Sequence, residues 1–336
     1  MFLYDKYSPK TNADLTFHQD IVQKIQQMGK DDEIPHLILY GADGSGKKTI
    51  ARLFLESIFD KDVNNTVNKI YTINGSGNKT TNIAIKQSPY HIVIEPNNNN
   101  FDRYLIQNIV KEYAKWIPVG VFRINKSFKV VLINNVDNLS YYAQMSLRRT
   151  MEKYSKTCRF LMVCNAISKL IDPLKSRCIC IRIPSPTEEE IIGTIMQVSY
   201  HEKNKMSLKN LCEIMKYSNG SIKQVLLALE CVSNNISPSN SYIHTIKKIV
   251  KLINEKNIEH VVEIRGLLYD ILMTNISGSH IITSILLMLC NSVELKFEKK
   301  LKLIESAAKY EHNLSIGRRE IIHLDSFVID TILILS

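Results

Sequence analysis

Short apolar runs of β-strand length recur through the first half of the chain, at residues 36–40, 90–94, 129–133, 159–164 and 178–183. Segments with apolar residues at helical spacing separate these runs. Strands that alternate with helices are typical of a parallel sheet that is covered by helices. The pattern therefore predicts an α/β domain over residues 1–184.

The second half of the chain shows helical periods and no convincing strand pattern. Ser185, Pro186 and Glu188 indicate a helix start, with serine as N-cap, proline at the first helical position and glutamate placed for a capping box. Helix breaks are expected at 218–220, 234–240, 277–278 and 317. We therefore expect a small helical domain over 185–238 and a second helical bundle over 239–336.

The composition fits several cores and a polyanionic partner. Single hydrophobic cores stop growing at about 250 residues. This chain has 336 residues, of which 45% are hydrophobic, so it can bury more than one core. The 43 Lys and Arg outnumber the 33 Asp and Glu, so the net charge is +10 and nucleic acid is the leading partner. Seven cysteines without CxxC spacing favour a reducing compartment over a zinc site or disulfides. A charged N-terminus and an interrupted apolar stretch at 271–290 predict neither a signal peptide nor a membrane span.

A glycine-rich loop, GADGSGKKT, follows the first predicted strand and precedes an amphipathic helical pattern. This is the context of a P-loop, in which backbone N–H groups and a helix N-terminus face phosphate oxygens and a lysine adds positive charge. The sequence predicts that nucleotide is bound by Gly41, Ala42, Asp43, Gly44, Ser45, Gly46, Lys47, Lys48 and Thr49.

Two features of an ATPase site are missing. Lys48 stands where a serine or threonine hydroxyl would bind magnesium, and Thr49 comes one residue late. The strand at 129–133 ends in Asn134 and Asn135 instead of an acidic pair, and Asp137 need not face the phosphate. The loss of a general base typically lowers a rate by about 10²–10⁴. We therefore expect ATP or ADP to bind with weak or no magnesium, no metal site of the usual kind, and poor hydrolysis.

Further segments resemble the replication factor C family of clamp loaders. DKYSP at 5–9 is similar to the family's N-terminal Glu-Lys-Tyr-Arg-Pro element, AQMSLRRTMEKY at 143–154 to its central helix, Asn165 to its sensor 1, and 176–178 to its Ser-Arg-Cys motif. The resemblance continues through RGLLY at 265–269 and AKYEH at 308–312, so it covers nearly the whole chain. Within the family the chain resembles the eukaryotic small subunit whose own site is degenerate.

The resemblance implies an AAA+ P-loop domain, a helical lid at 185–238 and an oligomerisation collar at 239–336. It implies a hetero-pentamer with other clamp-loader subunits, which opens a PCNA-type sliding clamp and closes it on primer–template DNA. The expected location is the nucleus, or a viral replication site if a large DNA virus encodes the chain.

Individual roles are carried over by position. Tyr7 and Pro9 match the element that flanks the nucleotide, although Ser8 replaces the family arginine, and Asn165 matches the sensor of the γ-phosphate. Lys223 stands where the lid normally has an arginine, and it keeps the charge but loses the planar fork.

Arg177 matches the arginine that the family directs across a subunit boundary onto a neighbour's ATP. A guanidinium suits this role because it stays charged and can fork onto phosphate oxygens. The alternative is a structural arginine that satisfies carbonyl groups at the end of a strand.

Three arginines are candidates for DNA contact. Arg103, at a predicted helix start, would touch a phosphate, or it is an ordinary surface arginine. Arg148 and Arg149 lie on the central helix near Gln144, and the resemblance implies a relay from DNA to the nucleotide sites. Salt bridges on a solvated or interface face are the alternative.

Three functional hypotheses remain. The first is a clamp-loader subunit that is itself non-catalytic and donates an arginine. The second is a self-sufficient AAA+ DNA motor such as a branch-migration helicase, which would need acidic residues at 134 and 135. The third is a P-loop scaffold that never meets DNA, and salt-sensitive binding to primer–template would count against it.

Overall fold

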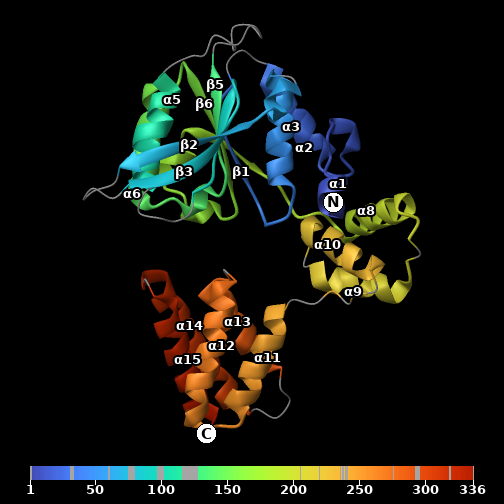
Figure 1. Cartoon of the computed structure of the whole chain (residues 1–336), viewed down its shortest axis with the longest axis vertical. Coiled ribbons are helices and arrows are strands. Elements are labelled where there is room, and N and C mark those ends of the chain that lie inside the picture. The colour runs from blue at the N-terminus through green and yellow to red at the C-terminus, as the bar shows by residue number, and fades with distance from the viewer. Residues whose placement is uncertain are drawn as a thin grey trace. The chain divides into compact units, whose positions relative to one another are not determined.

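The structure is a computed structural model, and it describes residues 2–30, 34–59, 61–74, 80–96, 102–115, 128–204, 206–218, 220–234, 236, 238, 241–274, 276–291, 296–317 and 319–335. The chain divides into two compact units, Met1–Pro238 and Ser239–Ser336 (Figure 1). The asparagine run at 97–100 lies outside the described residues.

A seven-stranded sheet forms the centre of the first unit, in the order β2-β3-β4-β5-β6-β1-β7. Its parallel part comprises β4 (His91–Ile94), β5 (Lys129–Ile133), β6 (Cys158–Cys164), β1 (His36–Tyr40) and β7 (Cys178–Arg182). These are the five strands expected from the apolar runs, with ends that differ by at most one residue. The expected α/β class with a parallel sheet is confirmed.

The sequence analysis missed a hairpin at one edge of the sheet. β2 (Val67–Asn74) and β3 (Thr80–Gln87) pair antiparallel, and β3 pairs antiparallel with β4. An antiparallel pair needs no crossover helix and does not have to be buried on both faces. Accordingly Val67 and Ile70 are 63% and 73% exposed. Polar residues interrupt β2, VNKIYTIN, so it lacks the continuous apolar run by which the other strands were found.

Helices cover both faces of the sheet (Figure 1). α2 (Gln19–Lys30) and α3 (Lys47–Phe59) share a core with Leu37 and Leu39 of β1. On the other face, Ile38 packs with residues of α4 (Asp102–Leu105), the π-helical turn η3 (Ile106–Val110), α5 (Lys111–Lys115) and α6 (Tyr141–Lys153). This alternation follows from the two-residue period of a strand.

The remainder of the first unit is helical. α8 (Glu188–His201), α9 (Leu208–Ser218) and α10 (Ile222–Ser233) surround a separate small core, against which Leu3 of α1 (Leu3–Lys6) also packs. The first unit thus holds the sheet together with α8–α10, and the expected domains 1–184, 185–238 and 239–336 stay predictions.

The expected start of α8 was wrong by two residues. Thr187, not Ser185, is the N-cap: its hydroxyl accepts from the Glu190 N–H at 3.3 Å, and the Glu190 carboxylate accepts from the Thr187 N–H at 2.8 Å. Both Ser185 and Thr187 have a glutamate three residues later. Pro186 is buried ahead of the helix, and the later of the two capping boxes forms.

The second unit consists of α11 (Ser241–Asn254), α12 (Val261–Met273), α13 (Gly278–Cys290), α14 (Phe297–Ile316) and α15 (Glu320–Leu335). Its core has members on all five helices, among them Ile249, Leu268, Ile285, Leu303 and Phe327. Within the described part of the chain, no helix combines the length and apolarity that a bilayer crossing requires.

Candidate nucleotide-binding site

The loop between β1 and α3 has the backbone of a phosphate cradle. Gly44 has a φ of 75°, in the left-handed region that favours glycine. A side chain at Gly41 would collide with the Ile183 carbonyl, and one at Gly44 would collide with the hydroxyl of Ser221. Without side chains at these positions the loop packs closely, and its N–H groups can approach an anion.

Two buried polar groups in the loop fit a phosphate. Lys47, the first residue of α3, is 6% exposed, and its ammonium donates to the carbonyls of Gly41 at 2.9 Å and Ala42. Burial lowers the pKa of Lys47. Ser45 is 1% exposed, and among the described residues its hydroxyl has no hydrogen-bond partner. An incoming anion would stabilise the charge of Lys47 and give the Ser45 hydroxyl an acceptor.

The two positions that would hold magnesium are joined to Glu95, which follows β4. The Lys48 ammonium lies 3.2 Å from Oε1 of Glu95, and the same oxygen accepts from Asn134 Nδ2 at 2.8 Å. Desolvation raises the pKa of Glu95, but hydrogen bonds from Asn134 and Lys48 outweigh it and lower the pKa. An ammonium beside this carboxylate disfavours a divalent cation, and the described residues contain no cluster of three or more His, Cys, Asp or Glu that would hold one.

The surviving acidic residue faces the sensor segment. Asn135, with a φ of 50°, turns the chain after β5 and leads to Asp137. Oδ2 of Asp137 accepts from the backbone N–H groups of Asn165 at 3.3 Å and Ala166 at 3.4 Å. Asp137 therefore fixes the position of Asn165, whose side chain is exposed at the end of β6.

The N-terminal element lies against α8 and α3. The Tyr7 hydroxyl donates to Glu202 at 2.6 Å, and the Tyr7 ring stacks on His201 with a centroid distance of 6.2 Å. The guanidinium of Arg52 on α3 donates to the Pro9 carbonyl. Tyr7 and Pro9 thus connect α8 with the helix that begins at the loop.

The start of α10 contacts the loop through its backbone. The Ile222 N–H donates to the Gly44 carbonyl at 3.3 Å, and Ser221 packs against Gly44. Lys223 is exposed, and its ammonium lies 5.4 Å from the ring centroid of Tyr4. The expected lid segment therefore reaches the loop through Ser221 and Ile222, and nucleotide contact by Lys223 stays a prediction.

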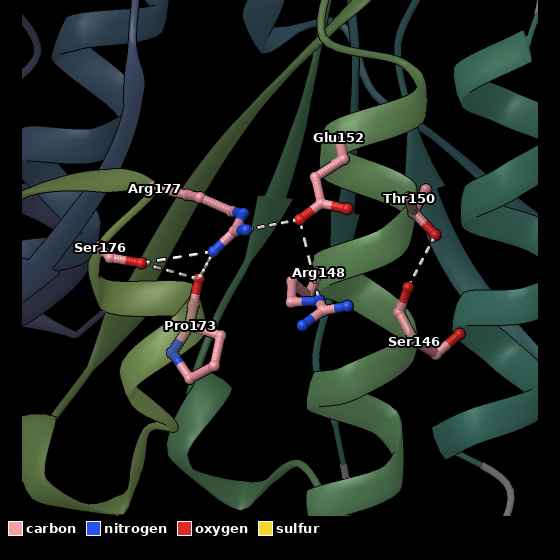
Figure 2. Close-up of polar contacts among 7 residues, drawn as sticks. All are labelled: Ser146, Arg148, Thr150, Glu152, Pro173, Ser176 and Arg177. Carbon is pink, nitrogen blue, oxygen red and sulfur yellow. Dashed lines mark hydrogen bonds and ion pairs between the residues drawn. The ribbon is translucent and has the colours of Figure 1, made fainter.

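Arg177 follows the short helix α7 (Asp172–Lys175) and precedes the edge strand β7. Its Nη1 donates to the Pro173 carbonyl at 2.7 Å and to the Ser176 hydroxyl at 3.3 Å, while Nη2 lies 2.7 Å from Oε1 of Glu152 (Figure 2). The side chain is 38% exposed. One carbonyl contact of the structural kind is thus present, at a helix rather than a strand, and the guanidinium is still accessible.

The DNA candidates differ in exposure. Arg103 on α4 and Arg149 on α6 are exposed, whereas Arg148 is half-buried with Nε 3.8 Å from Glu152. Gln144, on the same helix, is 3% exposed. Its side chain is held by backbone groups of Leu139, Lys169 and Ile171. DNA contact by the three arginines stays a prediction.

Several interacting residues were missed by the sequence analysis. Glu95 had a usable signal, because it directly follows a parallel strand, at the carboxyl end where such sheets place ligand-binding residues. Ser221, two residues before Lys223, was within the segment already singled out. Glu152 was within the helix segment 143–154 already singled out, although its pairing with Arg177 was not predicted. Glu202 had no signal, since it pairs with a residue distant in sequence.

A parallel sheet with a P-loop at the end of β1, followed by helical domains, defines an AAA+-type nucleotide-binding protein. Residues 17–187 match the family described as DNA polymerase III, delta subunit, and residues 242–336 match that described as replication factor C subunit 3, C-terminal domain.

Full-length relatives narrow the class. A replication factor C small subunit of Acanthamoeba polyphaga mimivirus is 37% identical, with 98% of this chain and 90% of the relative covered. Replication factor C subunit 3 of Arabidopsis thaliana is 33% identical, with 98% and 96% covered, and subunit 5 of Saccharomyces cerevisiae is 33% identical, with 96% of each covered. Among solved structures, Thermotoga maritima RuvB has a TM-score of 0.47 at 14% identity over 70% of each chain. The chain belongs to the replication factor C small-subunit family.

Proposed function

We propose that this chain is a clamp-loader subunit that binds adenine nucleotide, hydrolyses it poorly and donates Arg177 to a neighbouring subunit. It works with other clamp-loader subunits in a hetero-pentamer, which loads a PCNA-type clamp onto primer–template DNA in the nucleus or at a viral replication site. Membership of the replication factor C family and a net charge of +10 support this proposal.

Nucleotide binding rests on the loop. Lys47 and the Ser45 hydroxyl are buried at the start of α3, and the backbone from Gly41 to Gly46 supplies N–H groups. Asp43, Lys48 and Thr49 complete the segment, and Tyr7, Pro9, Asn165 and Lys223 flank it in our proposal.

The observation that carries the proposal is the contrast between Asn134 and Arg177. Asn134, at a magnesium position, is buried and hydrogen-bonded to Glu95, and its amide offers a metal no charge. Asn135, at the base position, cannot accept the proton of an attacking water. Arg177 is accessible and keeps a permanent charge. The chain thus lacks the groups for its own chemistry but retains a group that suits phosphate charge on another subunit, where arginine fingers accelerate hydrolysis by about 10³–10⁵.

Two measurements test the proposal. Isolated chain should bind fluorescent ADP but release phosphate from ATP negligibly, and Lys47→Ala should abolish binding. In the assembled complex, Arg177→Ala should preserve assembly and slow hydrolysis at one neighbouring site. Robust turnover by isolated chain that Lys47→Ala abolishes would instead favour a self-sufficient AAA+ DNA motor or ATPase.

A further inference from the structure

Glu152 connects Arg177 to the central helix α6. Its Oε1 lies 2.7 Å from Nη2 of Arg177 and 3.8 Å from Nε of Arg148, one turn earlier on the same helix (Figure 2). The two arginines therefore share one carboxylate oxygen, and the closer contact is to Arg177.

The contacts of Arg177 differ in what they anchor. Pro173 and Ser176 belong to the same local turn as Arg177, so they move with it. Glu152 lies on α6, which is fixed against the sheet by the fully buried side chains of Leu147 and Met151. Within the described part of the chain, Glu152 is thus the contact that holds the guanidinium relative to the core.

This arrangement leaves donors for a ligand. A guanidinium has five N–H groups. Nη1 makes two hydrogen bonds and Nη2 one ion pair, and Nε makes no polar contact with any residue that the structure describes. Because the side chain is 38% exposed, a phosphate oxygen can approach the remaining donors while Glu152 still holds the group.

We propose that Glu152 is a positioning residue that orients Arg177 toward the nucleotide of the neighbouring subunit. This inference rests on the proposed role of Arg177 as the donated arginine. A partly exposed ion pair stabilises a fold by only about 0–1 kcal/mol, so Glu152 contributes little to stability. A misplaced catalytic group can lower a rate by about 10²-fold, so the same contact matters for hydrolysis.

The test uses the assembled complex with hydrolysis confined to the neighbouring subunit by inactivating the other P-loops. Glu152→Gln, Arg177→Ala and the double variant are compared by kcat and KM for ATP with clamp and DNA present. Glu152→Gln should lower kcat on the order of tenfold, within the range that misplacement causes, and leave KM, assembly and melting temperature unchanged. Glu152→Gln should not lower kcat further when Arg177 is already replaced by alanine. Asp172→Asn is the matched control, because it removes a carboxylate that is 94% exposed on α7 and pairs with Lys175.

The outcomes separate the two proposals. If Arg177→Ala hydrolyses at the wild-type rate, the donated arginine and the role of Glu152 are both wrong. If Arg177→Ala is slow but Glu152→Gln is not, only the role of Glu152 is wrong. Three other results would also overturn the positioning role. They are an equal loss of kcat from Glu152→Gln in the presence and absence of the Arg177 side chain, a change confined to KM, and a loss of assembly.

Discussion

Lys48 and Glu95 form an ion pair with an N···O distance of 3.2 Å, and the same glutamate oxygen accepts a hydrogen bond from Asn134. Lys48 and Asn134 occupy the two positions from which a P-loop ATPase holds magnesium, and Glu95 joins them. The Lys48 ammonium thus stands at a position where P-loop ATPases generally have a hydroxyl that binds magnesium. Its charge is already balanced by Glu95, which leaves little attraction for a metal.

Nucleotide binding should therefore be insensitive to magnesium. We expect the Kd for fluorescent ADP in magnesium and in EDTA to differ by less than about tenfold, which corresponds to about 1.4 kcal/mol. Lys48→Thr combined with Asn134→Asp should create magnesium dependence, because it supplies a hydroxyl and a carboxylate in place of the ammonium and amide. Lys86→Thr, which removes another lysine that acts on Glu95, is the control and should not create it. Strong magnesium dependence of the wild type would contradict this account.

Gly44 should tolerate no side chain. Its φ of 75° disfavours other residues, and an added Cβ would collide with Ser221. Gly44→Ala should therefore lower the free energy of unfolding by about 1–3 kcal/mol and weaken ADP binding. Gly193→Ala on α8 is the matched control, since a Cβ there meets nothing within 4 Å. It should stabilise the helix by about 0.5–1 kcal/mol. Equal effects of the two variants in thermal unfolding would show that the loop is not constrained.

The parts of the fold that the sequence predicted are those with a local pattern. The five parallel strands are buried on both faces, so their apolar runs are continuous, and the P-loop residues are contiguous. Polar residues interrupt the apolar positions of β2, an edge strand, and of β3, and these interruptions hid the hairpin. Contacts between Glu152 and Arg177, or between Tyr7 and Glu202, depend on how separate elements pack, and no spacing along the chain encodes them. Figure 2 shows the first of these contacts.

Acid should weaken the fold through buried neutral histidines. Desolvation lowers the pKa of His91, which is 3% exposed, to about 4. The unfolded chain binds more protons than the native protein between that value and the ordinary pKa of about 6.5, so stability falls as the pH drops through this window. Each such histidine contributes a slope of up to about 1.4 kcal/mol per pH unit.

Replacing His91 should remove the contribution of one titrating group from the pH dependence of the free energy of unfolding. We expect His91→Gln to be less stable than wild type at pH 7, because it loses the hydrogen bond of Nδ1 with Ser88 at 2.7 Å. The difference should shrink toward pH 5 in urea unfolding. His36 has a pKa lowered by burial to about 4 as well, so part of the slope should remain. A constant difference across this range would show that His91 is not the titrating group.

Residues 239–336 should drive assembly. Their core contains no residue of the first unit, so they can be removed without opening the cores around the sheet and α8–α10. Several of their large apolar side chains are exposed, including Met273 at 84%, Val262 at 75% and Phe297 at 74%. Exposed apolar area of this kind is typical of a surface that another subunit covers. A 1–238 fragment should therefore stay soluble, bind ADP with unchanged affinity and fail to join the other subunits in size-exclusion chromatography. Retention of the fragment in the complex would place the assembly surface in the first unit, whereas loss of ADP binding would mean that the first unit depends on the second for its fold.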